Sequence, residues 1–228
     1  MKLAAKSKIA IILFVLASHF AARARAEQKY LTARDIRLIN KHWADYEFAA
    51  NKVGVPVLLL PSIHYRESNL LLGDWSKLLQ KVTINRGGPF MLDCGKEPDG
   101  SGFQRRIRDY ERKVYRACFG RGEAPLICKD FRFACVVAAY ELGEKLRCRD
   151  WTADCLEDAV WGYNGRASWC SKDDSAYLWS DPKNGVNLTV TYRKNSGEKV
   201  RFVDGRPGVM IIYKELSNVA DFKSVAKP

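Results

Sequence analysis

The sequence has few of the residues that most often bind transition metals. It contains only three histidines, and its seven cysteines include no Cys-x-x-Cys pair. Zinc sites in proteins are built mainly from closely spaced cysteine and histidine ligands. We therefore expect no metal site, and no motif in the chain points to an organic cofactor.

Long apolar runs are also missing, apart from one near the N-terminus. There, three lysines in the first eight residues precede the apolar run Ile9–Leu16, and Ala24-Arg25-Ala26 fits the small-x-small cleavage rule. This order is typical of a secretory signal peptide, and an uncleaved anchor is the alternative. We predict that residues 1–26 are a signal peptide. The mature protein would then be periplasmic or secreted, without stable membrane insertion.

No residue type dominates the composition, and no fixed-period repeat is present. Hydrophobic residues make up 47% of the chain and charged residues 28%, which is typical of a globular protein and argues against intrinsic disorder. Removal of the five basic residues in the predicted signal lowers the formal net charge from +12 to +7. A basic exported protein suits anionic partners such as the cell wall. Export makes nucleic acid an unsuitable partner, so we expect none.

All seven cysteines lie between residues 94 and 170, after the predicted signal. In an oxidising compartment this pattern predicts disulfides, at most three, with one thiol left over. Sequence alone does not give their connectivity.

Apolar residues recur at helical spacing in five segments, 32–54, 57–67, 103–117, 129–147 and 152–163. Thr32 and Asp35 resemble a capping box at the start of the first segment. Pro61 lies inside the second segment, where an interior proline clashes with the preceding turn. We therefore expect a kink or a late helix start there.

The apolar period changes near the C-terminus. Residues 186–192 alternate between apolar and polar, and 199–203 and 209–213 are also strand-like. The sequence thus predicts a mainly α fold: a helical domain over 27–180, followed by a small antiparallel β appendage and tail over 181–228.

Glu67 is the leading candidate for catalysis, because it ends the largely apolar segment 57–67. An apolar environment disfavours the ionised carboxylate and raises its pKa, which suits a general acid. His64 precedes Glu67 by one helical turn and either tunes the acid or is simply packed. Asp93 is the nearest candidate for a second carboxylate, and a structural role in a turn is the alternative.

The order of motifs around Glu67 adds a family resemblance. Glu67-Ser68 is followed by the glycine-rich stretch Gly87-Gly88-Pro89-Phe90-Met91, and later by Tyr163-Asn164-Gly165. In this order the chain resembles the lysozyme-like lytic transglycosylases over about residues 32–180. The resemblance implies a lysozyme-like helical domain that acts on the glycan strands of peptidoglycan.

The resemblance also implies roles for individual residues. Glu67 matches the single acid/base that cleaves the bond between N-acetylmuramic acid and N-acetylglucosamine and yields a 1,6-anhydro product. Ser68 matches a residue that positions the acid or the substrate. Tyr163 and Asn164 match the pair that faces the glutamate across the substrate site. Met91 stands in the substrate-binding stretch, near a position where the family often has glutamine.

Two other functions remain open from the sequence. A hydrolytic lysozyme or chitinase-like glycosidase would need a second carboxylate about 5–9.5 Å from the first. A non-catalytic, exported protein that binds the cell wall would keep the fold without turnover. Met91 and Pro61, which depart from the family pattern, favour this second alternative.

Overall fold

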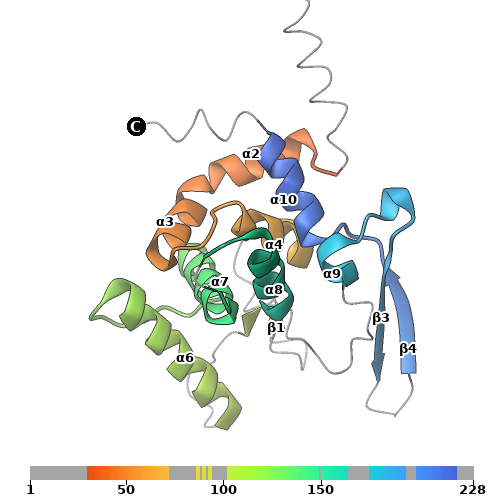
Figure 1. Ribbon diagram of the computed structural model, residues 1–228. Helices are drawn as coiled ribbons and strands as arrows, with labels where there is room; N and C mark the ends of the chain where they lie inside the picture. Colours follow the sequence, from red (N-terminus) through yellow and green to blue (C-terminus); the bar gives the residue numbers. More distant parts are fainter. Residues whose placement is uncertain are drawn as a thin grey trace, which may run out of the picture.

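The computed structural model describes residues 30–71, 86–87, 89–90, 92–93, 102–148, 150–163, 175–193 and 199–219. The predicted signal peptide, residues 1–26, lies outside them. Over these ranges the protein is mainly helical, with small antiparallel sheets, as the sequence predicted (Figure 1). Among these helices, none combines the length and the apolar character needed to cross a bilayer.

The described helices and strands follow one another in chain order. They are α2 (Ala33–Lys41), α3 (Trp43–Val53), α4 (Leu59–Ser68), β1 (Arg86–Gly87), β2 (Leu92–Asp93), α6 (Gly102–Phe119), α7 (Phe131–Lys145), α8 (Ala153–Tyr163), α9 (Ser175–Trp179), β3 (Leu188–Arg193), β4 (Lys199–Asp204) and α10 (Val209–Asn218). Strands β1 and β2 pair with each other, and β3 pairs with β4 in a separate hairpin.

The first predicted helix is divided into α2 and α3. The capping box at its start is confirmed, because the Thr32 side chain accepts from the backbone N–H of Asp35 and the Asp35 carboxylate accepts from that of Thr32. His42 interrupts the helix with a φ of −107° and a ψ of 12°. Gly54 then ends α3 at a φ of +84°, a left-handed conformation that glycine adopts without a steric penalty.

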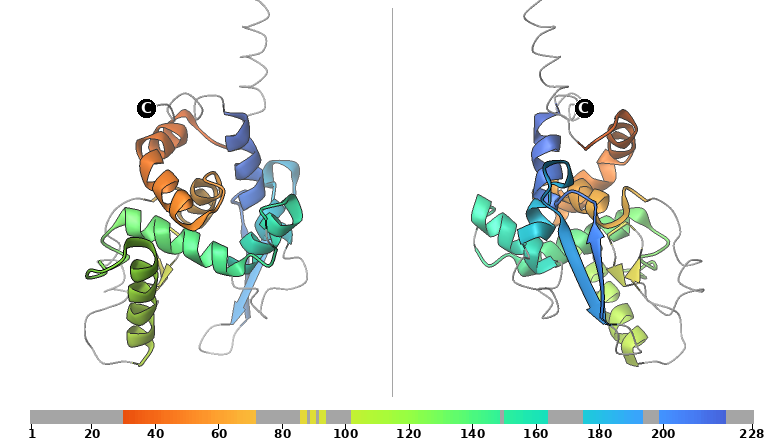
Figure 2. Two further views of the ribbon diagram at one scale, coloured as in Figure 1. Left: turned by 60° about the vertical axis from the view of Figure 1, so that its left-hand side comes forward. Right: turned by 90° about the vertical axis from the view of Figure 1, so that its right-hand side faces the viewer.

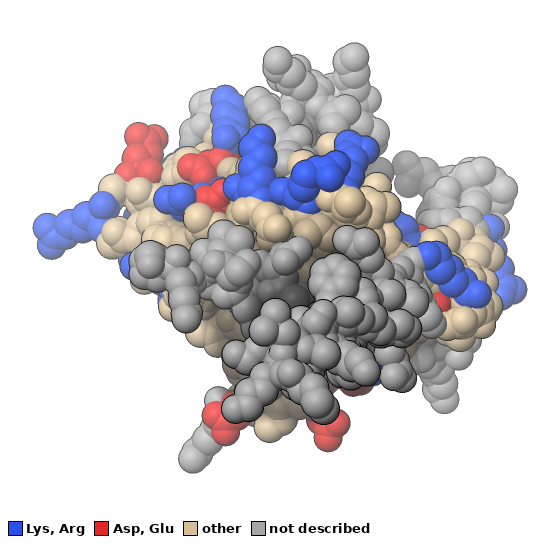
Figure 3. All heavy atoms as spheres, turned by 90° about the horizontal axis from the view of Figure 1, so that it is seen from above, with Lys and Arg blue, Asp and Glu red and all other residues tan. Residues whose placement is uncertain are grey.

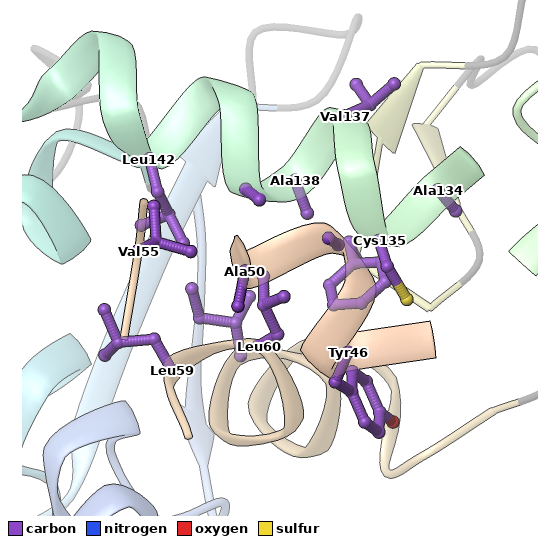
Figure 4. Packing of buried hydrophobic residues seen from close by; sticks show 14 of the residues in the cluster. Tyr46, Ala50, Val55, Leu59, Leu60, Ala134, Cys135, Val137, Ala138 and Leu142 are labelled. Carbon is purple, nitrogen blue, oxygen red and sulfur yellow. The ribbon is translucent and has the colours of Figure 1, made fainter. Parts of the chain in front are cut away.

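Helix α4 begins late, as Pro61 suggested. Because the helix starts at Leu59, Pro61 lies in the first turn, where its missing N–H leaves no helical hydrogen bond unmade. Leu59, Leu60 and Ile63 are fully buried. Helices α3, α4 and α7 share one core, in which Cys135, Ala138 and Leu142 of α7 point toward α3 and α4 (Figure 4). The helix that carries Glu67 is therefore anchored in the centre of the molecule.

The C-terminal segment differs from the prediction. Residues 186–192 and 199–203 do supply the two strands of the β3–β4 hairpin. The expected strand over 209–213 is wrong, because these residues begin helix α10, which packs against α4 (Figure 1, Figure 2). Val209, Ile212 and Leu216 are buried at a spacing of three and four residues, which is one face of a helix. The chain after residue 180 thus adds a helix to the core.

Candidate functional site

Glu67 lies in the last turn of α4 and is partly buried. The hydroxyl of Tyr177, on the short helix α9, donates a hydrogen bond to Oε1 of Glu67. Tyr177 is itself buried, with 4% of its surface exposed. The carboxyl group is thus held in one orientation by a side chain that has little freedom to move.

The surroundings of Glu67 act on its pKa in both directions. Burial raises the pKa, and this is the largest effect. The Tyr177 hydrogen bond and the charges of Arg66 and Arg206 lower it, while the charge of Asp204 raises it. The net effect is an increase, so Glu67 keeps its proton to a higher pH than an exposed glutamate does. That property is required of a general acid near neutral pH.

Two arginines and an aspartate surround the end of α4 beside Glu67. Arg66 Nη1 lies 2.9 Å from Oδ2 of Asp204 in a buried ion pair. Arg206 donates two hydrogen bonds to the same carboxylate, from Nε to Oδ1 and from Nη2 to Oδ2, each 3.0 Å long. Although burial opposes it, the hydrogen bonds from Arg206 and the charges of both arginines lower the pKa of Asp204. Asp204 is therefore ionised at neutral pH.

Arg206 also contacts the backbone of α4. Its Nη1 donates to the carbonyl oxygens of Arg66 at 2.7 Å and of Glu67 at 2.8 Å. Carbonyls in the last turn of a helix have no partner within the helix. Arg206 therefore supplies the hydrogen-bond donor for the carbonyls of the candidate acid, Glu67, and of the residue before it, Arg66.

Ser68 and Tyr163 both bind the short described segment 89–90. The Ser68 hydroxyl lies 3.0 Å from the carbonyl oxygen of Pro89, and the Tyr163 hydroxyl donates to that of Phe90 at 2.9 Å. These hydrogen bonds join Pro89 to α4 and Phe90 to α8. The structure thus brings Ser68 and Tyr163 together at Pro89 and Phe90. Met91 and Asn164 lie outside the described residues.

His64 is packed inside the protein, which is one of the two alternatives left open by the sequence. Its Nε2 lies 2.7 Å from the carbonyl oxygen of Leu71, and its Nδ1 lies 2.6 Å from the Tyr46 hydroxyl. Since a carbonyl only accepts, Nε2 carries the proton and Tyr46 donates to Nδ1. Burial lowers the pKa of His64 to about 3, so the ring is neutral. His64 ties the chain after Ser68 back to α4 through Leu71.

The turn that His64 secures has an uncommon backbone. Asn69 and Leu70 have φ values of 55° and 61°, in the left-handed region. Leucine rarely adopts this conformation, which costs on the order of 1 kcal/mol or more. The Ser68 hydroxyl also accepts from the N–H of Leu71 at 3.2 Å. Side chains of α4 therefore fix a strained turn directly after Glu67.

The cysteines partly match the sequence prediction. Cys148 and Cys155 form a disulfide, and Cys128 is also disulfide-bonded. Cys118 and Cys135 are free thiols, so the maximum of three disulfides is not reached. Within the described ranges, no group of three His, Cys, Asp or Glu side chains is arranged to hold a metal ion. Asp93 lies in β2, and its side chain is outside the described part of the chain.

Sequence reasoning missed the residues that contact the end of α4. Tyr177 stood out only as one of several aromatics between residues 161 and 179, and nothing distinguished Asp204 or Arg206 from other charged residues. Comparisons of the chain with protein-family models, curated proteins and solved structures gave no significant match.

Proposed function

We propose that this protein is an exported, lysozyme-like lytic transglycosylase that cleaves the glycan strands of peptidoglycan, with Glu67 as its general acid and base. The observation that carries the proposal is the state of Glu67. It is partly buried at the end of a buried helix, its pKa is raised by burial, and the Tyr177 hydroxyl orients it. A protonated, oriented carboxyl group is what protonation of a glycosidic oxygen requires.

In this mechanism a single carboxyl group serves twice. Glu67 first gives its proton to the oxygen that links N-acetylmuramic acid to N-acetylglucosamine, and that bond breaks. The resulting carboxylate then takes the proton of the C6 hydroxyl as the C6 oxygen bonds to C1, which closes the 1,6-anhydro ring. Glu67 is protonated again at the end. The Tyr177 hydroxyl stabilises the intermediate carboxylate by donating to Oε1.

The surroundings of Asp204 make it unsuitable as the second carboxylate that ordinary hydrolysis needs. Asp204 is the carboxylate that acts on Glu67 most directly among the described residues. Its two oxygens are engaged by Arg66 and Arg206. A carboxylate held by two guanidinium groups is a weak base and a weak nucleophile, because both roles require a free lone pair. Asp204 therefore does not supply the second catalytic carboxylate of a hydrolase.

The surface charge fits an anionic polymer as the substrate. Helix α2 carries Arg34, Arg37 and Lys41, all exposed and spaced three and four residues apart, so they share one face. Viewed from the side of α2 and α10, several lysine and arginine side chains lie on the described surface, with some acidic side chains among them (Figure 3). Peptidoglycan and its attached wall polymers carry carboxylates or phosphates, which such a surface attracts.

The proposal is tested by comparing Glu67→Gln with the unchanged protein on purified peptidoglycan. Glutamine keeps the shape of the side chain but cannot donate a carboxyl proton, so we expect release of soluble glycan fragments to stop. Glu123→Gln, at an exposed site, is the matched control and should remain active. Fragment release by Glu67→Gln at the unchanged rate would reject Glu67 as the acid. Binding without release by all three proteins would instead support a wall-binding protein.

A further inference from the structure

We propose that Asp204 and Arg206 form a positioning clamp for Glu67. In this clamp Arg206 fixes the helix end that carries the acid, and Asp204 balances the charge of the two arginines beside it. The proposal rests on the function proposed above, since it assigns a role around the same acid. It makes the end of β4 part of the candidate active site, although β4 lies more than 130 residues after Glu67 in the chain.

The first half of the clamp is geometric. One nitrogen of Arg206, Nη1, binds the carbonyls of both Arg66 and Glu67, while Nε and Nη2 bind Asp204. The planar guanidinium thus joins the end of α4 to the end of β4 in a fixed orientation. A positive charge also stabilises a helix C-terminus, where the backbone dipole is negative. A lysine at this position would keep the positive charge but could not donate hydrogen bonds to Asp204 and to the α4 carbonyls in this planar arrangement.

The loop that carries the clamp is itself fixed to α9. The Ser180 hydroxyl donates to the carbonyl oxygen of Arg206 at 2.9 Å, and the N–H of Gly208 donates to the carbonyl of Ser180 at 2.8 Å. Ser180 follows the helix that carries Tyr177, the hydrogen-bond donor to Glu67. The same loop therefore contacts both the end of α4, which carries Glu67, and the end of α9, which carries Tyr177.

The second half of the clamp is electrostatic. Among the described residues, four groups act on the Glu67 carboxyl: Tyr177 from α9, Arg66 from α4, Asp204 from the end of β4 and Arg206 from the loop after it. Two positive charges alone would favour the ionised form and leave Glu67 a poor proton donor. Asp204 contacts both arginines and offsets much of their charge. With Asp204 in place, the effect of burial is the largest one, and the pKa of Glu67 is raised.

The test measures the protonation of Glu67 directly. The exported protein, purified with its disulfides formed, is labelled with ¹³C at glutamate carboxyl carbons and titrated by NMR, and Glu67→Gln identifies the signal. We expect Asp204→Asn to lower the pKa of Glu67, because the arginines lose their counter-charge. We expect Arg206→Gln to raise it, because one positive charge is removed. Asp150→Asn and Arg201→Gln change the charge at exposed positions and should leave the Glu67 titration unmoved.

The clamp predicts that the pKa of Glu67 shifts in opposite directions in Asp204→Asn and Arg206→Gln. A general loss of packing would not produce opposite shifts. Unmoved titrations, or shifts in the same direction, would overturn the proposal. If Asp204→Asn fails to fold, the comparison of Arg206→Lys with Arg206→Gln tests the proposal instead. The lysine variant should keep the pKa of Glu67 near that of the unchanged protein, and the glutamine variant should raise it. On peptidoglycan, Arg206→Lys should lower kcat with little change in KM. The titration needs no substrate, so it tests the clamp independently of the proposed function. The expected pKa shifts can be absent while cleavage still depends on Glu67, and they can be present in a protein that does not cleave peptidoglycan.

Discussion

The hydroxyl of Tyr177 donates to the carboxyl of Glu67 across 110 residues of sequence. The contact joins α9 to the last turn of α4, and the Arg66 guanidinium lies 5.4 Å from the centre of the Tyr177 ring. Tyr177 thus touches both the acid and one of the cations that tune it. The local state of Glu67 depends on segments that lie far from it in the chain.

Replacement of Tyr177 by phenylalanine should slow cleavage without loss of the fold. The variant keeps the buried ring and removes only the donor to Glu67, so the intermediate carboxylate loses a hydrogen bond. A hydrogen bond to a charged group contributes about 1.5–3 kcal/mol, which corresponds to a fall in kcat of about tenfold to a hundredfold. The Tyr177 bond also lowers the pKa of Glu67, so the alkaline limb of the pH–rate profile should move to higher pH. An unchanged profile would show that this contact has no part in turnover.

Gly208 should tolerate no side chain. A Cβ at this position would overlap the backbone carbonyl of Leu178, which cannot move aside as a flexible side chain does. We expect Gly208→Ala to lower the free energy of unfolding by about 2–3 kcal/mol. Gly205→Ala is the matched control, because no atom lies within 4 Å of its added Cβ. Urea unfolding of both variants measures the difference, and equal stability would contradict the packing of this loop against α9.

The pH dependence of stability should contain a contribution from His64. The pKa of His64 is lowered from 6.5 in the unfolded chain to about 3 in the folded protein, because the ring is buried. Between these two values the unfolded chain binds the extra proton, so stability falls as pH decreases from 6.5 toward 3. For one group the slope approaches about 1.4 kcal/mol per pH unit.

The variant His64→Gln isolates this contribution. Glutamine does not titrate, and its amide can still donate to the carbonyl of Leu71. We expect it to be less stable than the unchanged protein at pH 7 but to lose less stability on acidification. Urea unfolding at several pH values gives both slopes. Identical slopes would mean that His64 is already able to accept a proton in the folded state.

The disulfide Cys148–Cys155 should stabilise the connection between α7 and α8. The two cysteines are seven residues apart, and closure of so short a loop in the unfolded chain corresponds to about 2–3 kcal/mol. Replacement of both by serine should lower the free energy of unfolding by that amount. A reducing agent should destabilise the unchanged protein by at least this amount, because it also breaks the disulfide of Cys128. Equal unfolding midpoints for the variant and the oxidised protein would contradict the prediction.

Local patterns in the sequence predicted most of the helices. The capping box at Thr32, the late start of α4 at Pro61 and the end of α3 at Gly54 all depend on residues next to them in the chain. Glu67 could be found for the same reason, because the apolar run that precedes it predicts a buried helix. Its raised pKa follows mainly from that burial.

The features that sequence reasoning missed depend on contacts between distant segments. The run Val209–Tyr213 is apolar enough for a strand or a buried helix, and only packing against α4 decides for the helix. Tyr177, Asp204 and Arg206 reach Glu67 only through the fold. No local periodicity marks an arginine that will satisfy helix carbonyls 139 residues earlier.

The most direct test of the central claim is mass spectrometry of the soluble products released from peptidoglycan. We expect the unchanged protein to release muropeptides that end in 1,6-anhydro-N-acetylmuramic acid, and Glu67→Gln to release none. Products with ordinary reducing ends would contradict the transglycosylase mechanism and point to hydrolysis with a second carboxylate. Anhydro products formed equally by Glu67→Gln would contradict the role of Glu67 itself.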